Sequence, residues 1–563
     1  MTGGYNVPQT VLGASARNAK CARAISDAAT NGCVNVVYPT SVGANKAETC
    51  LDTRAAEPVS AVELPNNHTS ITPNDGVILT TADDDHLTSM KGFGETEMVA
   101  RKGDLPLFPP MASPNSFTWN DLDGETFCHR VNAAYTEAVH WRRNVFSVPS
   151  GKAGKAFVTE LSRLWQAYGS AGAMECIALR AASLMCILLL QKPHEKSKAK
   201  EHSACLERRL VTWSKGSVEE LLHEGRTIQA YLRRKKIGQN ANQITRTFTN
   251  LMLNGRISAA MRVISDAPNG GLLDLDAKAN ETQTVREVLK EKHPEGKPAD
   301  QDSLLAEDAG PPAPHPVIFD HLTGNSIRAA ALRTFGGAGP SGLDAAGWRR
   351  LCCSFHAASK SLCAALAGVA RRIATSYVDP EGLAAFTACR LCPLDKCPGV
   401  RPIGISEVPR RLIGKALMVV LGKDVQTAAG SFQLSAGQTS GCEAAVHAMR
   451  KLFDDPDTEG VLLVDAKNAF NTLNRQAALW NVKVLCPSLG PTVINTYRSD
   501  VELFVGGEKL FSREGTTQGD PLAMAIYSVA VTPLIHEVAT TGTKQIWFTD
   551  DAAGSNKLTS LRN

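Results

Sequence analysis

The sequence predicts an α+β fold, and three of its features carry that prediction. Apolar residues recur at helical spacing between about residue 116 and residue 264, which is typical of amphipathic helices. After residue 316, short apolar runs end in aspartates or glycine turns, which is typical of strands and hairpins. A Pro-rich stretch over 295–316 separates these two sequence patterns. It predicts a linker between a helical region and an α+β unit over 317–563.

Residues 1–115 are expected to form a mostly disordered leader. They are rich in Thr, Ala, Asn, Gly and Asp, and turn signals such as Pro73-Asn74-Asp75-Gly76 interrupt them. No helical or strand period is sustained. Such a segment buries too little apolar surface to offset the entropy that it would lose on folding.

Residues 116–294 are expected to form a helical N-terminal region with a basic face. Its most apolar run, Leu184–Leu190, is too short to span a bilayer and predicts a core helix, so we expect no membrane partner. Between 191 and 240, lysines and arginines accompany periodic Leu and Ile. This cationic face either lies along nucleic-acid phosphates or is a solvated surface. Arg233–Lys236 also fits a nuclear address, a weak pattern.

Composition narrows the class of protein only slightly. The chain has 563 residues, enough for two to four domains, and its net charge of +4 neither requires nor excludes a nucleic-acid partner. Fifteen cysteines in a chain of this length do not indicate a disulfide scaffold, and no secretory signal precedes them. An intracellular location, nuclear or cytoplasmic, is therefore expected.

Three segments near the end of the chain place polar side chains after apolar runs. A buried strand over Val461–Val464 is expected to deliver Asp465. A glycine turn presents Gln518-Gly519-Asp520-Pro521 before a helix. A strand over Ile546–Phe548 is expected to deliver Asp550 and Asp551 into a tight Ala552–Ser555 turn. If the two strands are neighbours, Asp465 and Asp550 converge at one sheet edge, where carboxylate oxygens suit hard divalent cations.

In this order and spacing, the three segments resemble the palm of reverse transcriptases, most closely those of non-LTR, LINE-like retroelements. Asp465–Phe470 resembles the first metal-binding motif of that family, Thr517–Leu522 its glutamine-glycine motif, and Phe548–Asp551 its double-aspartate motif. Upstream, Gly339–Asp344 and Arg390–Gly404 resemble its fingers motifs. The resemblance covers about 335–555. It implies a right-hand polymerase palm and fingers.

The resemblance implies a site for two Mg²⁺ ions, with Mn²⁺ as a substitute. Asp465 and Asp550 would be metal ligands, the backbone carbonyl of Ala466 a further oxygen donor, and Asp551 a partner in the same site. In such a site, paired ions clamp the attacking and leaving oxygens of a phosphoryl transfer. Thr549 and Asn471 depart from the usual alanine and aspartate of the family, but neither change removes a metal ligand.

The resemblance also implies a nucleotide-binding site. Phe470 would act as a steric gate that collides with a ribose 2′-hydroxyl and so favours deoxynucleotides. Gln518 and Gly519 would line the nucleotide and template pocket, because glycine lets backbone approach a base pair closely. Arg401 would hold the triphosphate with its planar fork of donors, and Lys396 would assist it.

The activity implied is that of an RNA-directed DNA polymerase, which adds deoxynucleoside triphosphates to a DNA primer on an RNA template. Twelve residues follow Asp551, so we expect the later palm motif, the primer grip and the thumb to be missing from this sequence. The alternative is a catalytically inactive relic, truncated or domesticated, that still binds nucleic acid. No RNase H or endonuclease motif is evident.

The cysteines near Arg401 leave a second alternative open. Cys389, Cys392 and Cys397 have a spacing that is found in zinc sites, with His356 or Cys363 as a fourth ligand. The same cysteines also fit a strand in which each serves as a small apolar side chain.

Overall fold

The computed structural model describes residues 33–37, 118–119, 122–170, 175–194, 196–234, 241–255, 257–264, 271–396 and 399–561. Contacts between Cα atoms place all of these in one unit. The leader predicted over 1–115 lies outside the described residues except for strand β1, Cys33–Val37. The fold is mixed α+β, as predicted, with most residues in helices and the strands in small sheets.

The region after residue 116 is helical around one buried helix. That helix is α4, in which the run around Leu184–Leu189 is buried, so the prediction of a core helix is confirmed. Helix α3 packs against α4, and Phe157, Leu161 and Trp165 are buried on it at helical spacing. The elements here are β2 (Thr118–Trp119), β3 (Leu122–Asp123), α2 (Gly124–Ala138), α3 (Lys152–Gly169), α4 (Glu175–Leu189), α5 (Ala199–Ser214), α6 (Val218–Arg234), α7 (Ala241–Leu253) and α8 (Ile257–Ile264).

Part of the basic face predicted over 191–240 is buried. Arg209 on α5 is 1% exposed, and it donates to the carbonyls of Leu189 and Gln191 at 2.9 and 2.6 Å. It also pairs with Glu224 of α6 at 2.8 Å. Arg209 therefore ties α5 and α6 to the end of α4 and is unavailable to a phosphate, whereas Lys198 and Lys200 remain exposed.

The segment predicted as a Pro-rich linker lies along the folded body. We call residues 292–309 the strap. Its backbone amides at Ala299 and Leu305 donate to Gln476 and Asn481 of helix α17 (Arg475–Leu485) at 2.7 and 3.3 Å. Trp480 of the same helix donates to the Leu305 carbonyl at 2.7 Å. These side-chain partners satisfy the strap's backbone, so the segment is part of the body rather than a spacer.

Short helices lie before and after the strap, within residues 271–345. The Leu273 amide donates to the Pro393 carbonyl at 2.9 Å, which joins this part to the hairpin of β4 (Cys389–Asp395) and β5 (Val400–Ser406). The elements are α9 (Val285–Glu291), the 3-10 turns η2 (Gln301–Ser303), η3 (Glu307–Ala309) and η4 (Pro316–His321), and α10 (Gly324–Leu332).

A second group of elements surrounds a four-stranded sheet with the order β5-β4-β7-β8, here called the second sheet. β4 and β5 form an antiparallel hairpin, and β4 runs parallel to β7. β7 and β8 form an antiparallel hairpin that turns at Gly506 and Gly507, both of which have positive φ. The elements are α11 (Ala345–Cys353), α12 (Ala357–Thr375), α13 (Pro380–Thr387), β4 (Cys389–Asp395), β5 (Val400–Ser406), α14 (Val408–Ala429), α18 (Gly490–Tyr497), β7 (Val501–Val505) and β8 (Glu508–Ser512).

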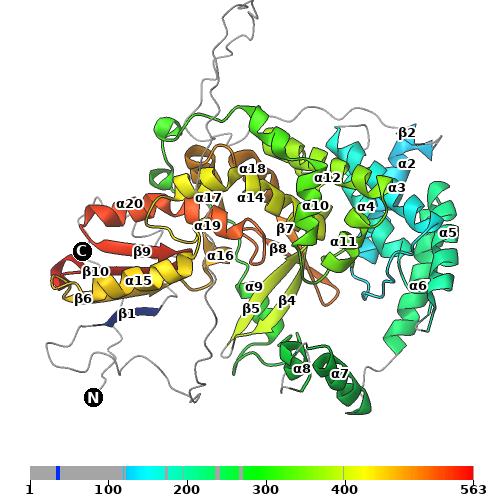
Figure 1. Cartoon of the computed structure of the whole chain (residues 1–563), viewed down its shortest axis with the longest axis horizontal. Coiled ribbons are helices and arrows are strands. Elements are labelled where there is room, and N and C mark those ends of the chain that lie inside the picture. The colour runs from blue at the N-terminus through cyan, green and yellow to red at the C-terminus, as the bar shows by residue number, and fades with distance from the viewer. Residues whose placement is uncertain are drawn as a thin grey trace, which may run out of the picture. The chain divides into compact units, whose positions relative to one another are not determined.

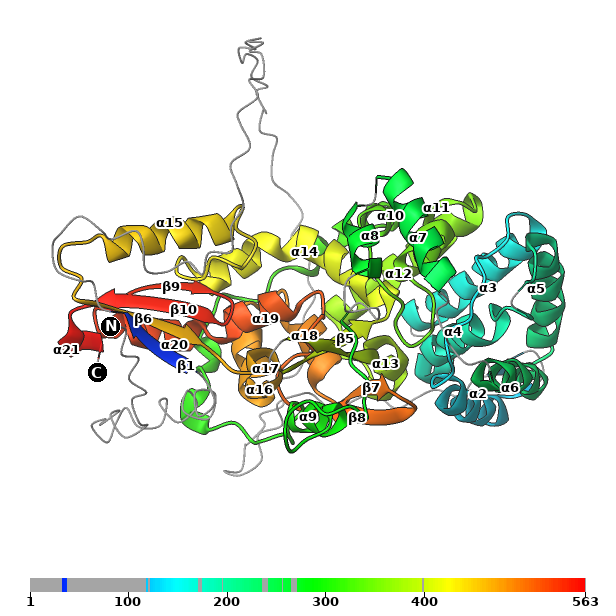
Figure 2. The ribbon, with the colours of Figure 1, turned by 90° about the horizontal axis from the view of Figure 1, so that it is seen from below.

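The first sheet has the order β1-β6-β10-β9 (Figure 1). Helix α15 packs beside β9, as Figure 2 also shows, and α19 and α20 pack on the sheet through Trp547. The remaining elements are α15 (Gly441–Phe453), β6 (Gly460–Asp465), α16 (Ala469–Thr472), α17 (Arg475–Leu485), α19 (Ala523–Ala530), α20 (Thr532–Thr540), β9 (Lys544–Phe548), β10 (Asp551–Asn556) and α21 (Leu558–Leu561).

Strand β6 is not buried along its length, contrary to the sequence prediction. Val461 is buried, but Leu463 is 41% exposed. In an antiparallel sheet, successive side chains face opposite sides, so a continuous apolar run does not imply that both sides are covered.

Among the described residues, one stretch is long and apolar enough to cross a membrane, Ala523–Thr540. It comprises α19 and α20, and its Tyr527, Val531 and Ile535 are buried in a core cluster with Ala469. Packing against the first sheet accounts for its apolar character.

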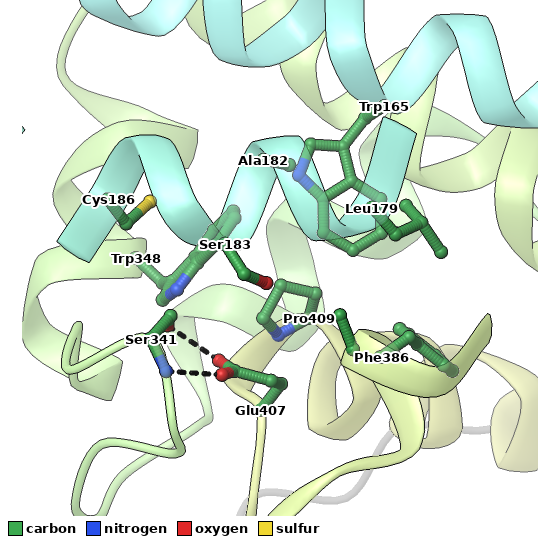
Figure 3. Close-up of a pocket in the computed structure, with 11 residues that line it drawn as sticks. Trp165, Leu179, Ala182, Ser183, Cys186, Ser341, Trp348, Phe386, Glu407 and Pro409 are labelled. Carbon is green, nitrogen blue, oxygen red and sulfur yellow. Dashed lines mark hydrogen bonds between the residues drawn. The ribbon is translucent and has the colours of Figure 1, made fainter. Parts of the chain in front are cut away.

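A buried carboxylate joins the Gly-rich turn near residue 340 to the end of β5. Glu407 is 3% exposed, and it accepts hydrogen bonds from the Ser341 amide at 2.6 Å and the Ser341 hydroxyl at 2.7 Å (Figure 3). The cavity beside it, lined by Trp165 and Trp348, has a volume of about 10 Å³. That is the size of one water at most, so this is a structural joint rather than a ligand site.

We predict that Glu407→Gln removes a pH dependence of stability. Burial raises the pKa of Glu407 from 4.5 to about 7 despite the Ser341 hydrogen bonds. The folded protein therefore holds this proton more tightly than the unfolded chain, and its stability should fall as pH rises between those two values. Urea unfolding midpoints measured across that window should fall in the wild type and stay flatter in the variant. Equal slopes would contradict the assignment.

Candidate active site

The register of β6 and β10 places two aspartates directly opposite each other. Asp465 at the end of β6 is the Cα partner of Asp551 at the start of β10. Opposed residues of an antiparallel pair have Cα atoms roughly 5 Å apart and share one face of the sheet. The register partner of Asp465 is thus Asp551 and not the predicted Asp550, which lies in the adjoining turn. Strand β10 also separates β6 from β9, so the two predicted strands are not immediate neighbours.

The face that carries these aspartates is opposite to the one that packs on α19 and α20. Asp551 pairs with Phe548, so Asp465, Asp551 and Phe548 share a face. Trp547 points to the other face and packs against the cluster of α19 and α20. Ala466 follows Asp465 and packs on that core side, while both aspartate side chains are exposed. A bound substrate would thus meet the carboxylates without disturbing the core.

The turn that carries Asp550 begins three residues earlier than the sequence predicts. Phe548 and Asp551 close the hairpin, so Thr549 and Asp550 form a two-residue turn. Ala552–Ser555, predicted to be the turn, belong to strand β10. Thr549 adopts φ +62°, a left-handed conformation that two-residue hairpins use. For a β-branched residue this conformation is strained, and it requires support from neighbouring groups.

Gln433 supplies that support, and the sequence analysis did not identify it. Its side-chain oxygen accepts from the Thr549 amide at 2.7 Å, and its side-chain nitrogen donates to the Thr549 carbonyl at 3.2 Å. Gln433 itself is fully buried. The Leu434 amide donates to the Trp547 carbonyl at 2.8 Å and the Trp547 amide donates to the Phe432 carbonyl at 2.9 Å, which holds this segment along β9. A glutamine before a glycine-rich stretch gives no sequence signal of this role.

The carboxylates perturb one another. Burial and the charges of Asp551 and Asp465 raise the pKa of Asp550, against a backbone hydrogen bond and Lys396, which lower it. Burial and the charge of Asp465 raise the pKa of Asp551. Crowding of like charges disfavours ionisation until a cation is added.

The chemistry of these donors fits Mg²⁺. The candidate ligands are all oxygens: the carboxylates of Asp465, Asp550 and Asp551 and the main chain at Ala466. Such ligands match a hard divalent cation. Within the described ranges, no three His, Cys, Asp or Glu side chains form a group that would hold a metal as it stands. The fit to Mg²⁺ therefore depends on the register that sets Asp465 opposite Asp551 and on the repulsion between the carboxylates, since they do not form a complete coordination sphere.

Three lysines from distant parts of the chain approach this edge. The pKa of Lys292 is lowered by burial and by the positive charges of Lys396 and Lys467. Asn468, at the start of α16, donates to the Lys292 carbonyl at 2.9 Å, which fixes the strap next to the segment that follows Asp465. Lys396 in turn acts on Asp550. Carboxylates and lysines at one edge suit a ligand that brings both anionic oxygens and divalent cations, such as a Mg²⁺-bound triphosphate.

Phe470 lies against Tyr527 beside the carboxylate edge. Their ring centroids are 5.3 Å apart, and Phe470 packs on the cluster of Ala469, Tyr527 and Val531. Burial and the charges of Asp550 and Asp551 raise the pKa of Tyr527, which keeps its phenol neutral. Phe470, the predicted gate residue, thus lies five positions after Asp465, and its ring packs against the cluster described above.

The Gln518–Gly519 turn docks on the outer edge of β5. The Gly404 amide donates to the Gln518 carbonyl at 2.8 Å. Gly519 has φ +109°, and a Cβ there would lie 2.6 Å from the Gly404 carbonyl oxygen, so glycine is required. Arg401 is exposed on the same strand, three residues before Gly404. The structure thereby connects the turn and the predicted triphosphate arginine through one strand.

The cysteines of β4 have structural roles. The Cys389 thiol donates to the Thr387 carbonyl at 3.5 Å, and both Cys389 and Cys392 are buried in the second sheet. Cys363 instead bonds the Cys352 carbonyl on neighbouring helices. These contacts favour the apolar interpretation over zinc; Cys397 lies outside the described residues.

No protein-family model matches this chain, and no curated protein is similar to it at a significant level.

We predict that Asp551→Asn stabilises the metal-free protein. The neutral amide removes repulsion with Asp465 and Asp550, and for exposed charges the gain should be about 1 kcal/mol or less. Calorimetry at neutral pH in EDTA should show a higher midpoint. Millimolar Mg²⁺ should then raise the midpoint of the wild type more than that of the variant. Asp424→Asn, an exposed change on α14, is the control; an equal Mg²⁺ effect in Asp551→Asn would contradict a metal role.

Proposed function

We propose that this chain is an RNA-directed DNA polymerase that adds deoxynucleotides to a primer 3′-hydroxyl. In this proposal the first sheet is the palm and the hairpin of β4 and β5 belongs to the fingers. The observation that carries it is the facing register of Asp465 and Asp551, with Asp550 in the adjoining turn. This register brings together two motifs that are far apart in the sequence.

The surroundings of the carboxylates support the proposal. The edge has lysines at 292, 396 and 467 to meet a triphosphate, and a backed aromatic ring at Phe470 to meet a sugar. The Gln518 turn is docked on the strand of Arg401. A metal-binding module without polymerase chemistry does not account for the ring and the docked glycine turn. That the template is RNA follows from the resemblance of the motifs to the LINE-like family.

The chain's own residues have separable tasks in this reaction. Asp465, Asp550 and Asp551 would hold two Mg²⁺ ions. When bound, these ions supply charge neutralisation and a lowered pKa for the primer hydroxyl. Lys396 and Arg401 orient the triphosphate from the hairpin, and Lys292 adds charge from the strap. Gln433 holds the Asp550 turn in its strained conformation. Positioning, rather than covalent chemistry, is the protein's main contribution.

The cellular setting is consistent with this activity. Eleven cysteines in the helical and α+β parts that the structure describes are free thiols, which suits a reducing compartment. We place the protein inside the cell, in the nucleus or cytoplasm, where nucleoside triphosphates are available.

We predict that Asp550→Asn abolishes primer extension and leaves template binding nearly unchanged. The carboxylate contributes to metal binding, whereas nucleic-acid affinity depends mainly on cationic residues. Extension of a DNA primer on poly-rA with Mg²⁺ should fall by at least about 10³-fold, in the range that loss of an electrostatic catalytic group produces. Filter binding at fixed salt should change little.

Asp424→Asn serves as the matched control and should extend the primer like the wild type. Extension by Asp550→Asn at wild-type rate would exclude the metal role. If the wild-type chain binds template without any extension, the inactive nucleic-acid-binding relic becomes the better description.

We predict that Phe470→Ala relaxes sugar discrimination. Removing the ring opens space where a 2′-hydroxyl would otherwise collide, so incorporation of ribonucleotides should rise relative to deoxynucleotides by at least about tenfold, the effect of roughly 1.4 kcal/mol. The ratio of kcat/KM for the two sugars measures this. Leu473→Ala, which trims the same cluster away from the sugar, is the control. An unchanged ratio in Phe470→Ala would remove the gate assignment.

A further inference from the structure

A fully buried ion pair lies behind the Gln518–Gly519 turn. Asp520, the next residue, has a side chain that is 1% exposed, and it pairs with Arg410 of α14, whose side chain is 4% exposed. The remaining capacity of the carboxylate is satisfied by the Tyr497 hydroxyl at 2.6 Å and the Leu522 amide at 2.7 Å. A buried charge is tolerated only with such complete pairing.

The partners of Asp520 reach into three other elements. Arg410 also donates to the Thr387 carbonyl at the end of α13, at 2.6 Å. The Tyr497 hydroxyl, from α18, accepts from the Thr517 amide at 3.2 Å. Burial and the charge of Asp520 raise the pKa of Tyr497, so its phenol stays protonated and donates. The network therefore grips both sides of the turn, at Thr517 and at Asp520.

The other side of the turn meets β5. The hydrogen bond from Gly404 to the Gln518 carbonyl joins the turn to the edge of that strand, and the close approach of Gly519 to Gly404 leaves no room for displacement inward. Because β5 carries Arg401, the depth at which Asp520 is held decides where Gln518 lies relative to this arginine. A surface ion pair would not transmit such a constraint, since it is solvated and mobile.

We propose that the Arg410–Asp520 pair, with Tyr497, is a positioning device that sets the affinity for the incoming nucleotide by fixing the Gln518–Gly519 turn against β5. The device rests on the proposed polymerase function. None of its three residues touches the nucleotide, so each acts through the turn. Its signature is a change in nucleotide KM, as opposed to a uniform loss of active protein.

The test compares three changes in the full chain. Asp520→Asn removes the charge, and Tyr497→Phe removes one hydrogen bond while keeping the ring. The double variant Arg410→Met/Asp520→Leu replaces the pair by apolar side chains, a change that often preserves stability. Asp500→Asn, which breaks an exposed pair with Arg513 near β7, is the matched control. Steady-state single-nucleotide extension gives kcat and KM, and hydrogen–deuterium exchange without substrate reports on residues 514–522.

Asp520→Asn should raise the nucleotide KM about tenfold. Tyr497→Phe should raise it less, because this change removes only one buried hydrogen bond to a charged group. Amides in 514–522 should exchange faster, while those of β6 and β10 do not change. The double variant should regain the unfolding midpoint but keep the raised KM. The control should match the wild type in all measurements.

Two results overturn the proposal: recovery of the wild-type KM in the double variant, which would make the pair a stability element only, or unchanged exchange in 514–522. If Asp520→Asn does not fold, Tyr497→Phe and the double variant carry the same comparison. If the wild-type chain extends no primer, the proposed polymerase function is contradicted instead. Exchange in 514–522 then decides alone whether the pair holds the turn, and unchanged exchange overturns that as well.

Discussion

The pairing of β6 with β10 is the constraint on which the site depends, because it forces Asp465 and Asp551 to face each other on one side of a sheet. Like charges in opposed positions destabilise an antiparallel pair. The pair persists because the opposite face is well anchored: Trp547 packs against Val531 and Ile535, and Gln545 donates to the Ile535 carbonyl at 2.8 Å. The helical core thus sustains a local arrangement that the carboxylates themselves oppose.

The turn between β9 and β10 is also unfavourable by itself, and neighbouring residues stabilise it. Thr549 is held at a positive φ, and its hydroxyl is buried without a hydrogen-bond partner in the described structure. The amide group of Gln433 and the backbone pairing of Leu434 with Trp547 over-determine the turn. Strain of this kind is typical of functional sites, where surrounding structure compensates for it. Here it places a carboxylate, Asp550, at the tip of a hairpin.

The strap changes how the chain's parts relate to the site. A Pro-rich composition predicts a spacer, yet the strap's backbone is bonded to side chains of α17, and Lys292 at its start lies near Lys396 and Lys467. Composition reports the absence of regular structure, since proline removes donors and restricts φ. It does not report whether polar side chains elsewhere will satisfy the backbone. A cation from outside the recognised motifs therefore joins the carboxylate edge.

The sequence by itself determined the α+β class, the helical N-terminal region and the core helix α4, because local periodicity and turn chemistry encode these features. Only the tertiary structure decided that Asp551 rather than Asp550 faces Asp465, that Arg209 is buried, that Gln433 holds the turn of Asp550, and that Lys292 lies near Lys396. Register, burial and long-range hydrogen bonds join residues that are hundreds of positions apart. No local pattern carries that information, because pairing partners are selected by packing of the whole core.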